Sequence, residues 1–544
     1  MDSRWISLLG LVTMLALAYG FSTNRSAVKP RTVIWGVGLQ FLLGVTILSE
    51  EKLHSFIGMF ILAFLVVLYI FEDALGARFS HLGNKAPWIV GAGTLVGAAL
   101  AVWLFREVAQ RSPVVLWLIA LAVIVLFASV RWRKAHLAGP ALALVLLMIV
   151  GELWARDIHG GDAFRTVSEG VGTFLELSDN GAKFMFGNLG DRGLFFTGED
   201  AAWPGFGFQF AFVVLPTIIF FSAFMSVLYY LGVVQVIVTA MARFMRWSLG
   251  TSGAETVSCS ANIFIGQTEA PFLIKPFIKE MTLSEVHAIM VGGFATVAGG
   301  VLAGYIGMGV SPGHLIAASV MSAPASLVLA KLLLPETEES KTLGEVEMPE
   351  IEVGDNMVEA AAAGTTDGLK LALNVGAMLI AFISLIAVVD LALSHLDRLI
   401  DGAILGGTAV VEGGPIPGIF PDSLKTFFGT ILRPLAFLMG VPWEDAAAVG
   451  YLLGIKLTVT EFVAYQVLAD YIASGEIGQR AIIIATYALC GFANFSSIGI
   501  QIGGISSLVP ERRKDLAKVA VRAMMGGALA SWTTATIAGI LITG

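Results

Sequence analysis

The chain has 544 residues, of which 56% are apolar and only 14% are charged, and its mean hydropathy is +0.82. Soluble domains are typically about 45–50% apolar and about 25% charged, so a cytosolic enzyme and a disordered chain are both excluded. The 33 basic residues are outnumbered by 41 acidic ones, and the net charge of −8 excludes a nucleic-acid partner. Cys259 and Cys490 both lie in apolar sequence, so no disulfide framework is expected. The composition predicts an all-α polytopic membrane protein that contacts lipid.

Long stretches without Asp, Glu, Lys or Arg indicate the membrane spans. Because a helix needs about 20 apolar residues to cross the hydrocarbon core, we predict about twelve spans. The run 286–330 counts as two of them, since it contains the turn signal Ser311-Pro312-Gly313. The run 201–242 is predicted to be one span that continues into an amphipathic surface helix. The other stretches are 5–24, 32–49, 53–71, 86–105, 112–130, 135–151, 371–389, 481–510 and 523–544.

The basic residues predict the orientation of the chain, because short loops rich in Lys and Arg stay in the cytoplasm. Alternate loops carry such residues at 25–31, 78–85, 131–134, 243–246 and 512–514. With these loops inside, both termini are expected outside the cytoplasm. The alternative for the first segment is a signal peptide, because Ala16-Leu17-Ala18 resembles a cleavage site.

Two other apolar regions each contain a glutamate. Residues 247–283 contain Glu269, and residues 445–475 contain Glu461. A charge at membrane depth costs at least about 2.5 kcal/mol, so both glutamates need a reason to be there. Each region is too short for two full spans, and we therefore predict two re-entrant helical hairpins.

The surroundings of the two hairpins repeat. Each hairpin contains Thr-Glu, at 268–269 and at 460–461, and the next span contains Gly-Phe-Ala, at 293–295 and at 491–493. The charge pattern makes the hairpins enter from opposite sides, which predicts an inverted repeat. Inverted repeats are typical of secondary transporters, whose binding sites lie near the membrane midplane.

Polar side chains gather at the predicted membrane depth of this repeat. They are Asn262, Gln267, Thr268, Glu269, Thr296, Thr460, Glu461, Asn494, Ser496 and Ser497. Amides, hydroxyls and carboxylates suit a neutral solute that is rich in hydroxyl groups. No cation is expected among them, because Lys456 is predicted to flank its hairpin.

The coupling ion has two candidates. Asn262, Thr296 and carbonyls freed at the hairpin break make a candidate sodium cage, because hard cations prefer oxygen ligands. A proton carried by a carboxylate is the alternative. From another functional class, the alternatives are a channel and an intramembrane enzyme that uses Glu269 and Glu461 as acid and base.

Four segments closely resemble the concentrative nucleoside transporter family. They are GQTEAP (266–271), SEVHAIMVGGFATVAGG (284–300), TEFVAY (460–465) and ALCGFANFSSIGI (488–500). The resemblance covers about 1–49 and about 165–544. It implies a homotrimer in a bacterial-type inner (plasma) membrane that couples sodium entry to nucleoside uptake by alternating access. It implies neither an enzyme nor an organic cofactor.

The resemblance also implies roles for individual residues. Those expected around the nucleobase are Gln267, Thr268, Glu269 and Val301. Those expected around the ribose are Glu461, Phe492, Asn494 and Ser497. Those expected to hold sodium are the side chains of Asn262 and Thr296 and the carbonyls of Ile265 and Val297.

These patterns divide the chain into segments. In order, they are two scaffold spans (1–49), a peripheral four-span insertion (50–160), an interfacial helix region (161–200), the first repeat (201–335) with hairpin one at 247–283, an acidic cytoplasmic linker (336–366) and the second repeat (367–544) with hairpin two at 445–475. The insertion is the part that the resemblance does not cover.

Overall fold

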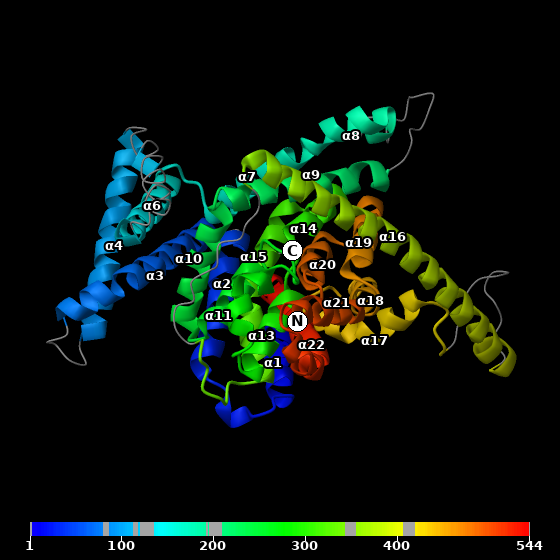
Figure 1. Ribbon diagram of the computed structural model, residues 1–544. Helices are drawn as coiled ribbons and strands as arrows, with labels where there is room; N and C mark the ends of the chain where they lie inside the picture. The colour runs from blue at the N-terminus through cyan, green and yellow to red at the C-terminus, as the bar shows by residue number, and fades with distance from the viewer. Residues whose placement is uncertain are drawn as a thin grey trace. The chain divides into compact units, whose positions relative to one another are not determined.

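The computed structural model describes residues 3–49, 51–79, 86–111, 118–119, 135–191, 194, 209–342, 355–405 and 419–542. Every regular element in these ranges is a helix, as the composition predicts (Figure 1). Among the described residues, eight helical segments are long and apolar enough to cross a membrane. They are Ser3–Gly20, Pro30–Leu48, Lys52–Ile70, Phe210–Tyr230, Leu283–Gly307, Pro312–Leu333, Met357–Ile404 and Pro510–Leu541. The span predicted over 112–130 lies almost entirely outside the described residues.

Residues 38–167 and 541–543 form one compact unit. Its helices are the end of α2 (Pro30–Leu48), α3 (Lys52–Phe79), α4 (Ala86–Arg111), α6 (Ala135–Ala155) and the start of α7 (Gly160–Glu176). Buried side chains of α3, α4 and α6 pack together, and Ala63, Ala98 and Ala143 are among them. Small residues let the helices approach closely where lipid provides no hydrophobic driving force.

Residues 1–37 and 168–540 form the second unit, which contains the segments of the predicted repeat. Its elements before the repeat are α1 (Ser3–Gly20), η1 (Arg25–Ala27), α8 (Ser178–Phe186) and η3 (Gly187–Gly190). Those of the first repeat are α9 (Phe210–Tyr230), α10 (Val233–Leu249), α11 (Gly253–Ala261), η5 (Ala270–Ile274), α12 (Lys275–Ile278), α13 (Leu283–Ala295), α14 (Gly299–Gly307) and α15 (Pro312–Leu333). Those of the second are α16 (Met357–Asp397), η6 (Arg398–Ile404), α17 (Leu424–Leu438), α18 (Ala446–Thr458), α19 (Glu461–Ser474), α20 (Gln479–Leu489), α21 (Phe495–Leu508), η7 (Pro510–Arg512) and α22 (Arg513–Leu541).

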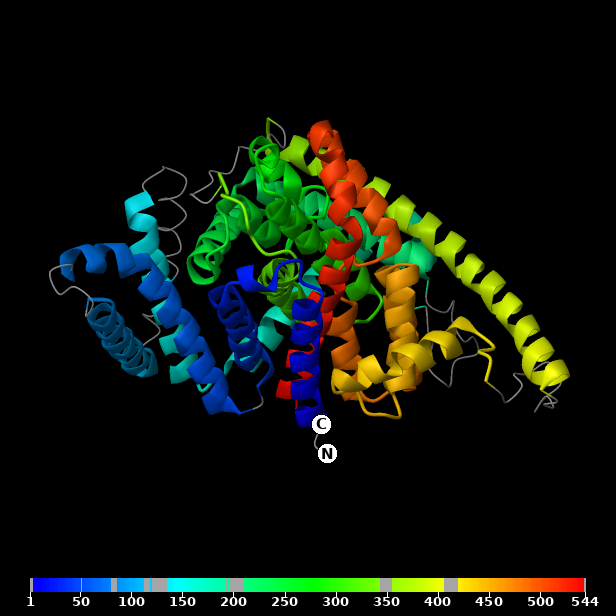
Figure 2. The same ribbon diagram turned by 90° about the horizontal axis from the view of Figure 1, so that it is seen from below.

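The two halves of this unit have the same order of elements. Each has a long apolar helix, an amphipathic helix, a hairpin, a helix broken in the middle and a final long helix. The long helices α9 and α16 pack against each other. In both views, the first repeat from hairpin one to α15 (green) lies beside hairpin two with α20 and α21 (orange) (Figures 1 and 2). Contacts of α13 with α21 and of α15 with α20 join the two groups of helices.

Two breaks within predicted continuous spans correct the sequence analysis. The first part of the run 286–330 is divided between α13 and α14, and the span 481–510 is divided between α20 and α21. In the second break, Gly491 follows the end of α20 and has a φ of +114°, a backbone conformation that favours glycine. A Cβ at Gly491 would lie 2.6 Å from the carbonyl oxygen of Phe294, so the two Gly-Phe-Ala segments contact each other directly.

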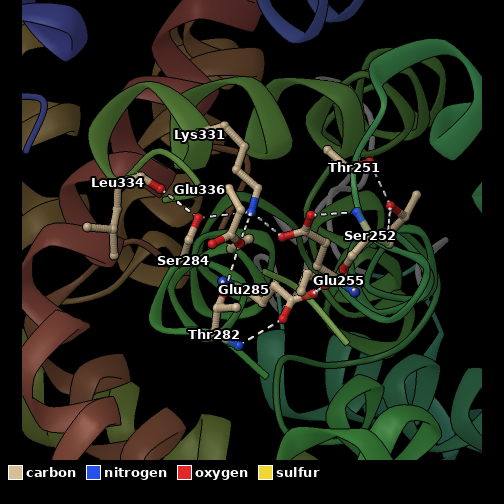
Figure 3. A network of polar contacts seen from close by, with 12 residues as sticks. Thr251, Ser252, Glu255, Thr282, Ser284, Glu285, Lys331, Leu334 and Glu336 are labelled. Carbon is tan, nitrogen blue, oxygen red and sulfur yellow. Dashed lines mark hydrogen bonds and ion pairs between the residues drawn. The ribbon is translucent and has the colours of Figure 1, made fainter. Parts of the chain in front are cut away.

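A polar network lies at the N-terminal ends of α11 and α13 (Figure 3). Ser252 with Glu255 and Thr282 with Glu285 form capping boxes that satisfy the first N–H groups of the two helices. Lys331 of α15 lies 2.7 Å from the Glu255 carboxylate, and both side chains are largely buried. The network therefore ties hairpin one to α13 and α15.

Candidate functional site

Hairpin one is interrupted between Asn262 and Glu269. The helix α11 ends at Asn262, whose side chain is fully buried. Neither Oδ1 nor Nδ2 of Asn262 has a hydrogen-bond partner among the described residues. An unpaired buried polar group costs about 1–3 kcal/mol, so this amide points to a ligand that the protein chain itself does not provide.

The break between α13 and α14 lies against this interruption. The N–H of Gly299 donates to the carbonyl of Phe264 at 3.2 Å, which joins the two non-helical segments. The hydroxyl of Thr296 is buried and donates to the carbonyl of Gly292 at 2.8 Å, so the lone pairs of its oxygen stay available. The two segments offer the side-chain oxygens of Asn262 and Thr296, and backbone carbonyl oxygens, as ligands. This set of oxygen ligands fits a sodium ion.

Glu461 is the centre of a second buried cluster. It is the first residue of α19, which Thr460 caps by accepting the N–H of Val463 at 3.3 Å. The positive end of the helix dipole favours a carboxylate at this position. Its Oε1 accepts a hydrogen bond from the hydroxyl of Tyr305 at 3.1 Å, and its Oε2 accepts one from Nδ2 of Asn494 at 2.8 Å.

The orientation of Asn494 is determined by the backbone. Asn494 caps α21, and its Oδ1 accepts the N–H of Ser497 at 2.8 Å and the hydroxyl of Ser496 at 2.7 Å. A backbone N–H can only donate, so the amide group of Asn494 must present its NH2 to Glu461. A sugar hydroxyl at this place would therefore meet one strong acceptor and one donor.

Gln267 of hairpin one joins this cluster from the other repeat. It is buried, and its Nε2 lies 3.4 Å from the hydroxyl oxygen of Ser497. The structure thus brings Gln267, Asn494, Ser497 and Glu461 into one hydrogen-bonded neighbourhood, although the first is more than 190 residues from the others along the chain.

The remaining predicted residues lie around this cluster in different surroundings. Thr268 is partly buried and packs against Gly504 of α21, whereas Glu269 is exposed and lies over Gly266. Val301 is buried on α14 one helical turn before Tyr305, so both side chains face the same side of that helix. Phe492 is partly buried in the break before α21. The carboxylate of Glu461 is therefore the buried one of the pair, and that of Glu269 is not.

Three residues of the site were not identified as such from the sequence. Tyr305 is fully buried, stacks on Tyr465 with ring centroids 4.1 Å apart, and donates to Glu461. Gln501 is fully buried and donates to Gln267 at 2.9 Å. A polar residue inside an apolar span was the available signal in both cases, but neither residue belongs to a motif.

The third residue, Lys456, contradicts the expectation that it flanks its hairpin. Its side chain is fully buried. Its Nζ donates to the carbonyls of Ala488 and Cys490 at 2.8 and 3.3 Å and to the hydroxyl of Ser531 at 3.2 Å. The last carbonyls of a helix carry partial negative charge, so the end of α20 holds this ammonium group.

Comparisons with known proteins identify the family of the chain. Family models match three parts of the chain: "Na+ dependent nucleoside transporter N-terminus" at 9–68, "Nucleoside recognition" at 211–312 and "Na+ dependent nucleoside transporter C-terminus" at 314–539. The sodium/nucleoside cotransporter 1 of Mus musculus is 41% identical over 469 residues, which are 83% of this chain and 67% of the relative. An uncharacterized transporter of Haemophilus influenzae is 44% identical over 387 residues, which are 70% of this chain and 86% of the relative.

Solved structures of one transporter have the same fold. CNTnw in an inward-facing substrate-bound state has a TM-score of 0.71 and 31% identity, with 99% of this chain and 98% of that chain covered. A variant of CNTnw in an outward-facing state has a TM-score of 0.70 and 31% identity, with the same coverage. These relatives are transporters and not enzymes, which removes the intramembrane enzyme from the alternatives. The chain belongs to the concentrative, Na+ dependent nucleoside transporter family.

Proposed function

We propose that this protein is a symporter that couples sodium entry to nucleoside uptake by alternating access. The observation that carries the proposal is the buried cluster of Glu461, Asn494, Ser497 and Gln267, drawn from both repeats. A carboxylate that already accepts two hydrogen bonds still has lone pairs for two sugar hydroxyls. The names of the relatives, which are sodium/nucleoside cotransporters, support the same substrate class.

The substrate would lie between the two repeats. Gln267, Thr268, Glu269 and Val301 would surround the nucleobase. Glu461, Asn494, Ser497 and Phe492 would bind the ribose, with Tyr305 holding the Glu461 carboxylate. None of these residues is basic, and Lys456 donates to the carbonyls of Ala488 and Cys490 and to Ser531, so a neutral nucleoside suits the site better than a phosphorylated nucleotide.

Sodium would bind between the interruption of hairpin one and the break after α13. Its ligands would be the side chains of Asn262 and Thr296 and the carbonyls of Ile265 and Val297. The unpaired, fully buried amide of Asn262 supports this assignment. A proton carried on a carboxylate is the alternative coupling ion.

The ion and the nucleoside would be coupled through the chain itself. The segment with Asn262 continues into Gln267, and the segment with Thr296 continues into α14, which carries Val301 and Tyr305. An ion that orders both segments therefore orders the base site. Because coupling is reciprocal, sodium should raise nucleoside affinity by the factor by which nucleoside raises sodium affinity.

Uptake into proteoliposomes tests the proposal. Radiolabelled uridine uptake is measured with a sodium gradient and with a proton gradient, each imposed alone. We expect accumulation with sodium and none when choline replaces sodium at constant pH. Full uptake in choline that a protonophore abolishes would show that the coupling ion is a proton and not sodium. No uptake of any nucleoside under either gradient would refute nucleoside transport.

The assembly and the orientation are part of the same proposal. We propose a homotrimer in a bacterial-type inner membrane with both termini outside the cytoplasm. The long apolar helix α16 supports contact with lipid or other subunits, because exposed apolar residues such as Leu373, Ile380 and Val388 run along it. Cysteine accessibility of the chain ends in intact cells would test the orientation.

A further inference from the structure

A pair of buried amides links the broken helix α21 to hairpin one. Gln501 of α21 is fully buried, and its Nε2 donates to the side-chain oxygen of Gln267 at 2.9 Å. The same nitrogen donates to the backbone carbonyl of Met290, in α13, at 3.2 Å. Gln501 itself lies one helical turn beyond Ser497 and has no part in the substrate contacts proposed above.

The carbonyl of Met290 determines which way both amides point. A carboxamide can be turned so that its oxygen and nitrogen exchange places. A backbone carbonyl can only accept, however, so Gln501 must direct its NH2 toward Met290. That nitrogen also faces Gln267, which must then present its oxygen to Gln501. The NH2 of Gln267 is left for the other side, where Ser497 lies at 3.4 Å.

The amide pair packs closely against Gly293 of α13. A Cβ at Gly293 would lie 2.7 Å from Nε2 of Gln501 and 2.9 Å from Cβ of Gln267. Glycine at 293 therefore lets the amide pair approach α13 closely enough to reach the Met290 carbonyl. The close approach of the amide pair therefore explains the glycine of the first Gly-Phe-Ala segment.

Gln501 also retains a polar atom that packing does not explain. Its Oε1 is buried and has no hydrogen-bond partner among the described residues. Leaving an acceptor unpaired in the interior is unfavourable, and an apolar side chain of the same length would avoid it. A glutamine at this position is therefore better explained by what its NH2 does for Gln267.

We propose that Gln501 is a positioning residue that fixes Gln267 as a hydrogen-bond donor toward the nucleobase, so that the site selects bases with an acceptor atom on the facing edge. The inference rests on the proposed function, which gives Gln267 the nucleobase as its ligand. Carbonyl oxygens and unprotonated ring nitrogens are the acceptors that nucleobases offer. A base with an N–H at that position would meet a donor and be rejected.

Base analogues and a double-mutant cycle test the proposal on the full chain in lipid nanodiscs. Binding of uridine, 2-thiouridine, 4-thiouridine, inosine and 7-deazainosine, in which a sulfur or a C–H replaces one acceptor at a time, is measured for the wild type, Gln501→Met, Gln267→Met and the double variant. For the wild type, loss of the recognised acceptor should weaken binding by at least about tenfold, because the donor is left unpaired. In Gln501→Met, where Gln267 is free to turn, that discrimination should largely disappear.

The cycle separates positioning from a structural effect. In the Gln267→Met background, adding Gln501→Met should change the affinities by less than about twofold, the usual limit of additivity. The ratio of affinities for uridine and 2′,3′-dideoxyuridine should change little in Gln501→Met, because Glu461 is held by Tyr305 and Asn494 and not by the amide pair. If Gln501→Met does not fold, Gln501→Leu serves the same purpose, since it too removes the donor.

Different results overturn the inference and the proposed function. Full discrimination among the base analogues in the folded Gln501 variant would overturn the inference while nucleoside binding stands. Equal effects of the Gln501 substitution with and without Gln267 would do the same. No binding of any nucleoside by the wild type would overturn the proposed function and, with it, the inference.

Discussion

Replacing Glu461 with glutamine should weaken the ribose contacts without disturbing the fold. In the variant, the amide oxygen must face Asn494, because the orientation of Asn494 is held by the N–H of Ser497. The new NH2 then faces the hydroxyl of Tyr305, which can rotate to accept it. The neighbouring groups therefore stay paired, and the change is confined to the atoms that face the substrate.

The expected magnitude follows from the remaining lone pairs. The Glu461 carboxylate accepts two hydrogen bonds from the protein, which leaves it two further acceptor positions for sugar hydroxyls. Hydrogen bonds to charged groups contribute about 1.5–3 kcal/mol and neutral ones about 0.5–1.5 kcal/mol, so loss of charge weakens each by about 1–1.5 kcal/mol. Two such bonds make about 2–3 kcal/mol, which corresponds to about 30- to 150-fold weaker nucleoside binding.

The assay compares ribonucleosides with dideoxynucleosides. Dissociation constants of uridine and 2′,3′-dideoxyuridine are measured for the wild type and for Glu461→Gln in nanodiscs. The wild type should bind the dideoxy compound far more weakly, and in the variant the ratio of the two dissociation constants should be about 30- to 150-fold smaller. Glu476→Gln is a matched control, because Glu476 is partly exposed and pairs with Lys425 at the surface, where ion pairs contribute little.

One result would refute this reasoning. If Glu461→Gln folds with the thermal stability of the wild type and still distinguishes uridine from its dideoxy analogue by the full factor, the ribose is bound elsewhere. Equal competition by the two compounds in the wild type would lead to the same conclusion.

Three other substitutions test separate parts of the structure. Asn262→Ala should raise the sodium concentration for half-maximal uridine uptake and weaken nucleoside binding indirectly, and an unchanged sodium titration would exclude Asn262 as a ligand. Lys456→Met should lower the thermal unfolding temperature, because each lost bond from the buried ammonium contributes about 1.5–3 kcal/mol; an unchanged temperature would contradict this. Gly491→Ala should abolish uridine binding or folding, since its Cβ would lie 2.6 Å from the Phe294 carbonyl, whereas the control Gly499→Ala, with no atom within 4 Å, should bind uridine normally.

The sequence by itself predicted the class of protein and the order of its parts. Apolar content and charge-free stretches predict helices in a membrane because each span must satisfy its own backbone and face lipid. The repeated Thr-Glu and Gly-Phe-Ala segments predict two equivalent hairpins, because each pattern is local in the chain. Glu461 was identifiable for the same reason: a charge in apolar sequence is unfavourable unless the fold compensates it.

Which polar groups meet depends on how distant segments of the chain pack together. The break at Gly491 depends on its contact with Phe294 of the other repeat, so the apolar sequence of 481–510 alone reads as one continuous span. The burial of Lys456 depends on the carbonyls that end α20, and its position beside a hairpin did not reveal them. Gln501 reaches Gln267 across 234 residues of sequence. The free energy of such a pair depends on how distant segments pack, and local composition and periodicity carry no information about that packing.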